Sequence, residues 1–189
     1  MFYTISSIGP VCRKLHAAGC KLVLATGFFD LLHAEHIKFL AKAKAAGDIL
    51  IVAVESDERA RVLKGEGRPI EPQPVRCQHL LDLRSPGSDL LRRRPMGVFS
   101  RARSAGETRS DPQSTLVDYV ISLPPDFNNF ASYDSLMSAV RPQVYAVSAH
   151  TSHQKSKDFL VEKYGGKLLV VHDFNPAIST TQIIQNTRI

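Results

Sequence analysis

The sequence predicts an α/β fold, a Rossmann-like doubly wound parallel sheet of about five strands. Short apolar runs rich in Val, Ile and Leu alternate with stretches of helical period along most of the chain. Such alternation requires right-handed crossovers that place helices on both faces of a parallel sheet. With 189 residues, 43% of them hydrophobic, the chain is long enough for one core. We therefore expect a single domain over residues 1–189.

Each element is predicted by its own pattern. Five apolar, β-branched runs predict strands at residues 21–25, 48–55, 116–122, 144–148 and 167–172. Amphipathic stretches and caps predict helices at residues 8–19, from about 34 to the glycine at 47, 57–63, 73–83, 132–140, 152–164 and 179–186. No G-x-G-x-x-G motif follows a strand, which argues against a dinucleotide site.

Residues 84–113 interrupt this pattern. They hold seven Arg, three acidic residues and no Lys, so they carry a net +4 of the chain's +6. Their Arg, Ser, Gly and Pro content lacks sustained periodicity and predicts an irregular Arg-rich loop or insertion. An out-of-frame segment would have the same composition. A loop that docks RNA or an acidic partner is the functional alternative.

Composition excludes several classes of protein. No basic segment followed by a long apolar core begins the chain, and no run of about 18 apolar residues exists, so we expect neither a signal peptide nor a membrane span. Cys12, Cys20 and Cys77 are odd in number and form no C-x-x-C. These features predict reduced thiols and a cytoplasmic location.

The most informative stretch is residues 21–40, a strand, a glycine turn and the start of a helix. Gly27 lets the backbone approach a ligand closely. His33 and His36 stand three residues apart at the helix entrance, where unpaired N–H groups and about half a positive charge attract phosphate. Both imidazoles can donate to phosphate oxygens. We call residues 27–36 the histidine segment.

Two other interpretations of the histidine pair remain open. The residues can be ordinary polar side chains at a helix start, or a His-x-x-His zinc site. No Cys or third His lies at ligand spacing nearby, and the i, i+4 pattern of helical zinc proteases is missing. Phosphate binding is therefore favoured, and no protein metal site is predicted.

The segment Gly27-Phe28-Phe29-Asp30-Leu31-Leu32-His33-Ala34-Glu35-His36 resembles the G-x-F-D-x-x-H-x-G-H signature of the cytidylyltransferase-like nucleotidyltransferases. The nearest likenesses are the heptose-phosphate adenylyltransferases and the glycerol-3-phosphate cytidylyltransferases. The resemblance covers about residues 21–76 and 116–187 and implies the HxGH-type nucleotidyltransferase fold. Glu35 stands where the family has glycine. A carboxylate there repels a nucleotide unless it points away or helps to hold magnesium.

The resemblance implies three groups of site residues. Catalytic roles fall to His33, His36 and Lys64. Nucleotide binding falls to Thr26, Gly27, Phe28, Phe29, Asp30 and Arg68, and to the Ser-Thr-Thr before the last helix, Ser179, Thr180 and Thr181. Taken alone, Lys64 and Arg68 are also explained by a solvated basic loop, and Ser179 by a helix cap. Residues 173–177 hold no Arg, unlike the cytidylyltransferases, which tilts the expected nucleotide toward ATP.

Three further residues follow the strand at 144–148 and depart from the family's usual Gly-Asp turn. Ser148, His150 and His153 are candidates for contacts with the base or the acceptor phosphate. Exposed loop histidines are an equally good account.

The resemblance implies a Mg²⁺-dependent nucleotidyltransferase that joins ATP or CTP to a small phosphorylated sugar or alcohol and releases pyrophosphate. Its partners are the nucleoside triphosphate and the acceptor, with no membrane or nucleic acid; a homodimer is common in the family. One alternative is a catalytically impaired nucleotide-binding protein of the same fold. Another is an RNA-binding module that uses the Arg-rich loop.

Overall fold

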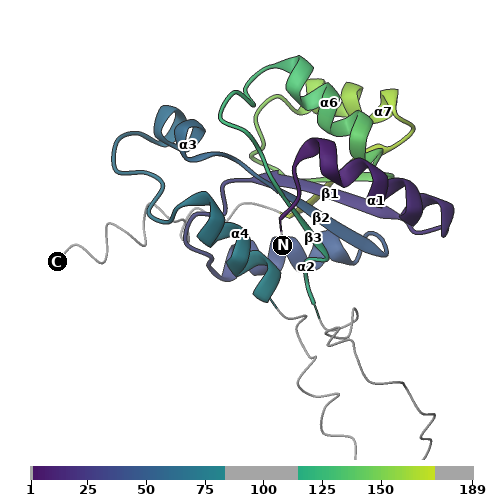
Figure 1. Ribbon diagram of the computed structural model, residues 1–189, viewed down its shortest axis with the longest axis horizontal. Helices are drawn as coiled ribbons and strands as arrows, with labels where there is room; N and C mark the ends of the chain where they lie inside the picture. The colour runs from purple at the N-terminus through teal and green to yellow at the C-terminus, as the bar shows by residue number, and fades with distance from the viewer. Residues whose placement is uncertain (1, 84–114, 173–189) are drawn as a thin grey trace, which may run out of the picture.

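The computed structural model describes residues 2–83 and 115–172. The Arg-rich loop at 84–113 and the expected helix at 179–186, with Ser179, Thr180 and Thr181, lie outside the described residues. Five parallel strands form one sheet in the order β3-β2-β1-β4-β5 (Figure 1). This arrangement confirms the predicted doubly wound, Rossmann-like sheet.

All five expected strands are present, and so are the expected helices that fall within the described residues. The strands are β1 (Leu22–Gly27), β2 (Ile49–Val54), β3 (Tyr119–Ser122), β4 (Val144–Ser148) and β5 (Lys167–His172). The helices are α1 (Ile5–Ala17), α2 (Ala34–Lys44), α3 (Asp57–Lys64), α4 (Gln73–Asp82), α6 (Phe130–Val140) and α7 (Gln154–Lys163).

The largest differences from the prediction are at two helix boundaries, the start of α1 and the end of α2. Helix α1 begins at Ile5 instead of residue 8, because Thr4 forms a capping box: its hydroxyl accepts from the Ser7 N–H at 3.2 Å, and the Ser7 hydroxyl accepts from the Thr4 N–H at 2.8 Å. Helix α2 ends at Lys44, ahead of Gly47. Gly47 instead allows the backbone to pass close to the Lys21 segment, since a Cβ there would lie 2.7 Å from the Lys21 carbonyl oxygen.

Helices cover both faces of the sheet (Figure 1). Alternate strand residues face opposite layers. On β1, Leu22 and Leu24 join the core beneath α1, α6 and α7, whereas Val23 and Ala25 join the core beneath α2 and α4. Strands β1, β2 and β4 are therefore buried on both sides, which explains their continuous apolar runs, whereas the edge strand β5 is largely exposed.

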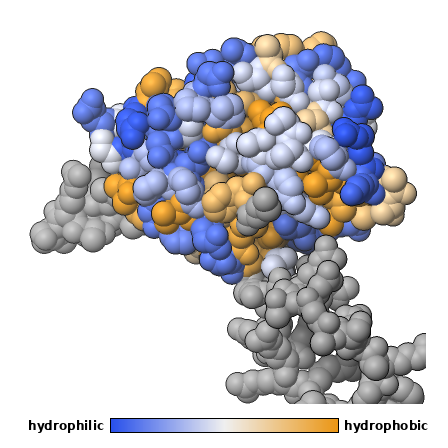
Figure 2. All heavy atoms as spheres, in the orientation of Figure 1, coloured by the Kyte–Doolittle hydropathy of each residue, from blue (hydrophilic) through white to orange (hydrophobic). Residues whose placement is uncertain are grey.

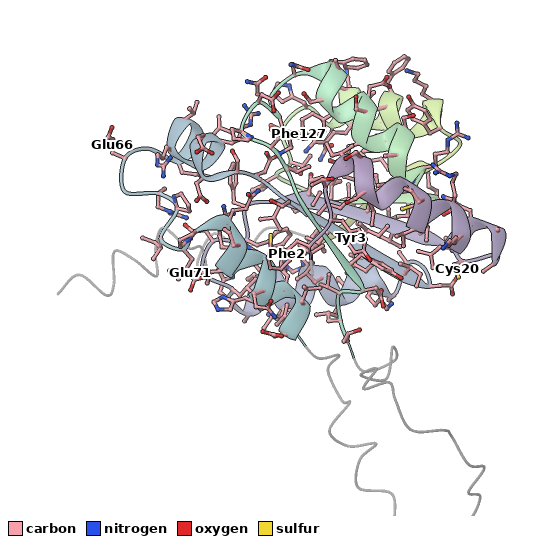
Figure 3. All side chains as sticks on the ribbon, in the orientation of Figure 1. Phe2, Tyr3, Cys20, Glu66, Glu71 and Phe127 are labelled. Atoms are coloured by element: carbon pink, nitrogen blue, oxygen red, sulfur yellow. The ribbon has the colours of Figure 1, made fainter. Side chains whose placement is uncertain are left out.

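The edges and surface complete the domain. Tyr3 pairs with the outer edge of β3, where its N–H donates to the Val120 carbonyl at 2.9 Å (Figure 3). Polar and charged side chains cover much of the face in Figure 2, with apolar residues scattered among them. Cys12, Cys20 and Cys77 are free cysteines. Within residues 2–83 and 115–172, no helix is both long and apolar enough to cross a membrane.

The strand order locates the ligand edge. Strand β1 pairs with β2 on one side and with β4 on the other. The chain therefore reverses its direction of winding at β1, and ligands of such sheets bind beyond the carboxyl ends of the strands at this switch point. Strand β1 ends at Gly27, so the histidine segment begins at the switch point.

Candidate active site

The backbone of the histidine segment takes an unusual path. Phe29 and Leu31 have φ of 50° and 55°, in the left-handed region that non-glycine residues rarely adopt. Phe29 is only 5% exposed, and its ring lies 5.4 Å from that of His36. A Cβ on Gly27 would lie 3.0 Å from a Phe29 ring carbon. Gly27 thus makes room for the buried Phe29 side chain, which supports His36.

Asp30 fixes this turn to the loop after α3. Its side chain is 3% exposed, and its Oδ2 accepts from Arg68 Nε and Nη2, both at 2.7 Å. Its Oδ1 accepts from the N–H groups of Ile70 at 3.0 Å and Glu71 at 3.2 Å. The structure therefore pairs two of the residues expected to bind nucleotide, Asp30 and Arg68, with each other. This pairing gives both a positioning role.

Arg76 is a site residue that our sequence analysis missed. It is fully buried in α4, and its guanidinium donates to the carbonyls of Phe28, Glu55 and Glu71 and to the Asp57 carboxylate. One side chain thereby ties the histidine segment to the end of β2 and the start of α3. The available signal was its spacing: Arg76 precedes the buried Cys77 and lies four residues before the buried Leu80.

The histidine pair lies where the sequence predicts. His33 is the N-cap residue of α2, and its side chain makes no capping hydrogen bond. The rings of His33 and His36 stack with centroids 3.8 Å apart and planes at 22°. In the described part of the chain, neither buried Nδ1 atom has a hydrogen-bond partner. Two imidazoles are thus held together at a helix N-terminus, with hydrogen-bonding capacity to spare.

Burial decides the charge of this pair. Desolvation, followed by the charge of His33, lowers the pKa of His36 to about 4. Desolvation also lowers the pKa of His33, against an opposing effect of Glu35. Both rings are therefore neutral at pH 7 in the free protein, so each carries one N–H that can donate. An anion that binds here therefore meets hydrogen-bond donors that are already in place.

Glu35 points away from the histidine pair, toward β5. Its carboxylate contacts Lys38 Nζ at 2.7 Å and His172 Nε2 at 2.8 Å. These hydrogen bonds, Lys38 first, hold the pKa of Glu35 below its usual value. The residue that replaces the family's glycine thus joins the start of α2 to the last residue of β5.

Lys64 contacts the histidine segment, and Thr26 directly precedes it. Lys64 is the last residue of α3, is exposed, and places Nζ 5.8 Å from the centre of the Phe28 ring. The Thr26 hydroxyl shares a 2.8 Å hydrogen bond with the Tyr145 hydroxyl of β4. The structure therefore brings Lys64 to this segment and gives Thr26 a partner on the neighbouring strand.

The other candidate residues lie at the carboxyl ends of the strands or outside the described residues. Ser148 ends β4, and His150 and His153 are exposed in the turn before α7. They lie at the carboxyl end of a strand, as the histidine segment does. The described residues contain no group of three or more His, Cys, Asp or Glu that could hold a metal ion.

A family model named cytidylyltransferase-like matches residues 24–186. The chain belongs to this family of nucleotidyltransferases. The match includes the histidine segment, Lys64 at the end of α3 and the loop that carries Arg68. This membership agrees with the resemblance of the histidine segment to the family signature.

Curated relatives agree with the assignment. "Bifunctional protein HldE" of Desulfatibacillum aliphaticivorans is 29% identical over 97% of this chain and 30% of its own length. The protein of the same name from Alcanivorax borkumensis is 31% identical over 91% of this chain and 29% of its own length. The chain thus spans about a third of these relatives or less.

The fold also matches solved structures. A lipopolysaccharide core biosynthesis protein from Thermoplasma volcanium GSS1 aligns over 83% of this chain and 98% of its own, with a TM-score of 0.53 and 20% identity. A pantoate-beta-alanine ligase from Francisella tularensis aligns over 99% of this chain and 77% of its own, with a TM-score of 0.52 and 12% identity. At these identities the likeness shows the fold alone.

Proposed function

We propose that this protein transfers a nucleotidyl group from ATP or CTP to a small phosphorylated sugar or alcohol. An oxygen of the acceptor phosphate attacks the α-phosphorus of the nucleotide, the bond to the β-phosphate breaks, and pyrophosphate leaves. The observation that carries this proposal is the stacked, neutral His33–His36 pair at the N-terminus of α2, beside the switch point of the sheet. Family membership supports it.

The site's own groups account for charge stabilisation, which is most of what this chemistry requires. His33 and His36 donate to the triphosphate, together with the unpaired N–H groups of the first turn of α2. Lys64, beside Phe28, adds a positive charge at the same segment. Arg68 holds Asp30 and so keeps the turn in shape. Ser179, Thr180 and Thr181 are proposed to anchor the nucleotide on the family's pattern.

The metal in this proposal is Mg²⁺ that arrives with the triphosphate. Mg²⁺ is usually bound through one or two carboxylates plus substrate phosphates rather than by a protein cage. The ion neutralises charge on the leaving phosphates. We favour ATP over CTP because residues 173–177 hold no Arg.

Pyrophosphate release tests the proposal. The full chain is incubated with Mg²⁺, either ATP or CTP, and one of a panel of sugar and polyol phosphates, and pyrophosphate is measured with a coupled assay. We expect release that depends on both substrates. Nucleotide binding without release on any acceptor would favour an impaired nucleotide-binding protein instead. Because Glu35 points toward Lys38 and His172, its presence no longer argues for that alternative.

Glu35→Gln tests whether the departure from glycine hinders the nucleotide. Because Lys38 and His172 already offset the carboxylate, we expect the Kd of Mg-ATP to change by less than about threefold. Titration calorimetry measures this Kd at pH 7. Tightening by about tenfold or more would show that the Glu35 charge does act on the triphosphate.

A further inference from the structure

A second polar cluster lies beside the histidine segment, on the face of the sheet covered by α6 and α7. Glu55 follows β2 directly, and its N–H donates to the Gly27 carbonyl at 3.0 Å. The Glu55 carboxylate accepts from the Tyr133 hydroxyl of α6 at 3.1 Å. Lys157 of α7 lies near enough for its charge to act on Glu55. Four separate elements thus supply the acceptor cluster: Glu55, Arg59, Tyr133 and Lys157.

The cluster has unused hydrogen-bonding capacity. Glu55 is only 5% exposed, yet its Oε2 has no hydrogen-bond partner among the described residues, and neither has the buried Nε of Arg59. These two atoms lie 4.0 Å apart, which is too far for a direct hydrogen bond. A hydroxyl oxygen placed about 2.8 Å from each can accept from Nε and donate to Oε2. The geometry therefore fits an inserted hydroxyl group.

Burial acts on the charges of the cluster. Desolvation raises the pKa of the Glu55 carboxyl, although the Tyr133 hydrogen bond and nearby cations oppose the rise. Desolvation also lowers the pKa of Lys157, with Glu55 opposing. Two cations face one carboxylate, so a ligand that carries both hydroxyls and negative charge would satisfy the cluster better than water alone.

We propose that Glu55, Arg59, Tyr133 and Lys157 form the subsite for the hydroxyl groups of a phosphorylated polyol, the acceptor of the reaction proposed above. The carboxylate accepts from the hydroxyls, Arg59 donates to them, and Lys157 attracts the acceptor's charge. The subsite adjoins the phosphate site through two contacts, Glu55 N–H to Gly27 and Thr26 to Tyr145. The Lys157 Nζ lies 6.0 Å from the centre of the Tyr145 ring, which completes the connection.

Binding to the full chain tests this subsite. Calorimetry measures the Kd of glycerol 3-phosphate, ribose 5-phosphate, mannose 1-phosphate and inorganic phosphate for wild type, Glu55→Gln and Arg59→Gln. The matched controls are Glu58→Gln and Arg61→Gln, whose side chains are 57% and 59% exposed on the same helix as Arg59. Melting curves establish that each variant folds, and Arg59→Gln keeps the test available if Glu55→Gln does not.

We expect at least one polyol phosphate to bind wild type about 10- to 100-fold more tightly than inorganic phosphate, the usual worth of hydrogen bonds to charged groups. Glu55→Gln and Arg59→Gln should lose most of this preference, while the controls keep it and the Kd of Mg-ATP stays unchanged. Equal affinity of wild type for all four probes, or a preference that survives in both variants, would overturn the subsite.

The subsite and the proposed reaction fail in different ways. If the polyol preference depends on Glu55 but no pyrophosphate is released, the reaction is wrong and the subsite stands. If pyrophosphate is released with an acceptor KM that neither variant changes, the reaction stands and the subsite is wrong.

Discussion

Replacing His36 by Ala is expected to slow turnover about 10²- to 10³-fold, the usual cost of losing one donor to a developing oxyanion. His36 is the more strongly desolvated member of the stacked pair, and neutral imidazole loses no proton when it donates to the triphosphate. The variant should still melt cooperatively, because His36 Nδ1 has no partner among the described residues that its removal would leave unpaired. The rate of pyrophosphate release at saturating nucleotide measures the effect.

The matched control is His16→Ala, at the other end of the strands from the histidine segment, near the start of β1. His16 Nε2 contacts the Val140 carbonyl at 3.0 Å, and its Nδ1 contacts Gln143, which supports the start of β1. This variant should lose some stability and keep its turnover. Near-normal turnover in His36→Ala, measured under the same conditions, would contradict the mechanism.

Replacing Arg76 by Met is expected to cost about 3–5 kcal/mol in the free energy of unfolding, as breaking a buried ion pair usually does. The substitution removes the donors for three backbone carbonyls, Phe28, Glu55 and Glu71, and for the Asp57 carboxylate. Met keeps most of the side-chain volume, so the loss comes from unpaired polar groups rather than from a cavity. Urea unfolding at pH 7 measures it.

Arg61→Met is the control for this second prediction. Arg61 is 59% exposed and pairs only loosely with Glu58 at 3.8 Å, so its loss should change stability by less than about 0.5 kcal/mol. If Arg76→Met unfolds at the same urea concentration as Arg61→Met, Arg76 does not hold the histidine segment in place.

Most of the fold could be predicted because its inner strands are buried on both faces. Continuous apolar runs such as Ile49–Val54 identify such strands without any tertiary information. Helix boundaries were less accessible: the start of α1 depends on a capping box at Thr4 and Ser7, which a search for apolar period overlooks. Gly47 was wrongly predicted to end α2. A glycine is needed there because a side chain would collide with the Lys21 carbonyl of the segment before β1.

The site divides in the same way. His33 and His36 were predictable because their chemistry is local: two imidazoles in one helical turn after a glycine. The Asp30–Arg68 pair spans 38 positions of sequence, and the Arg76 contacts reach up to 48 positions, so no local pattern reveals them. The direction of Glu35 depended on His172, 137 positions away. Pairings of this kind exist only once the sheet has formed.

Thermal unfolding with magnesium and a nucleoside triphosphate tests most directly the claim that the histidine segment binds the triphosphate. A ligand at about 100 times its Kd stabilises a protein by roughly 2.7 kcal/mol, a shift that a melting curve resolves easily. The account predicts that ATP or CTP raises the melting temperature of wild type and that His36→Ala loses most of the rise. A cooperative melt of wild type that neither nucleotide shifts would contradict it.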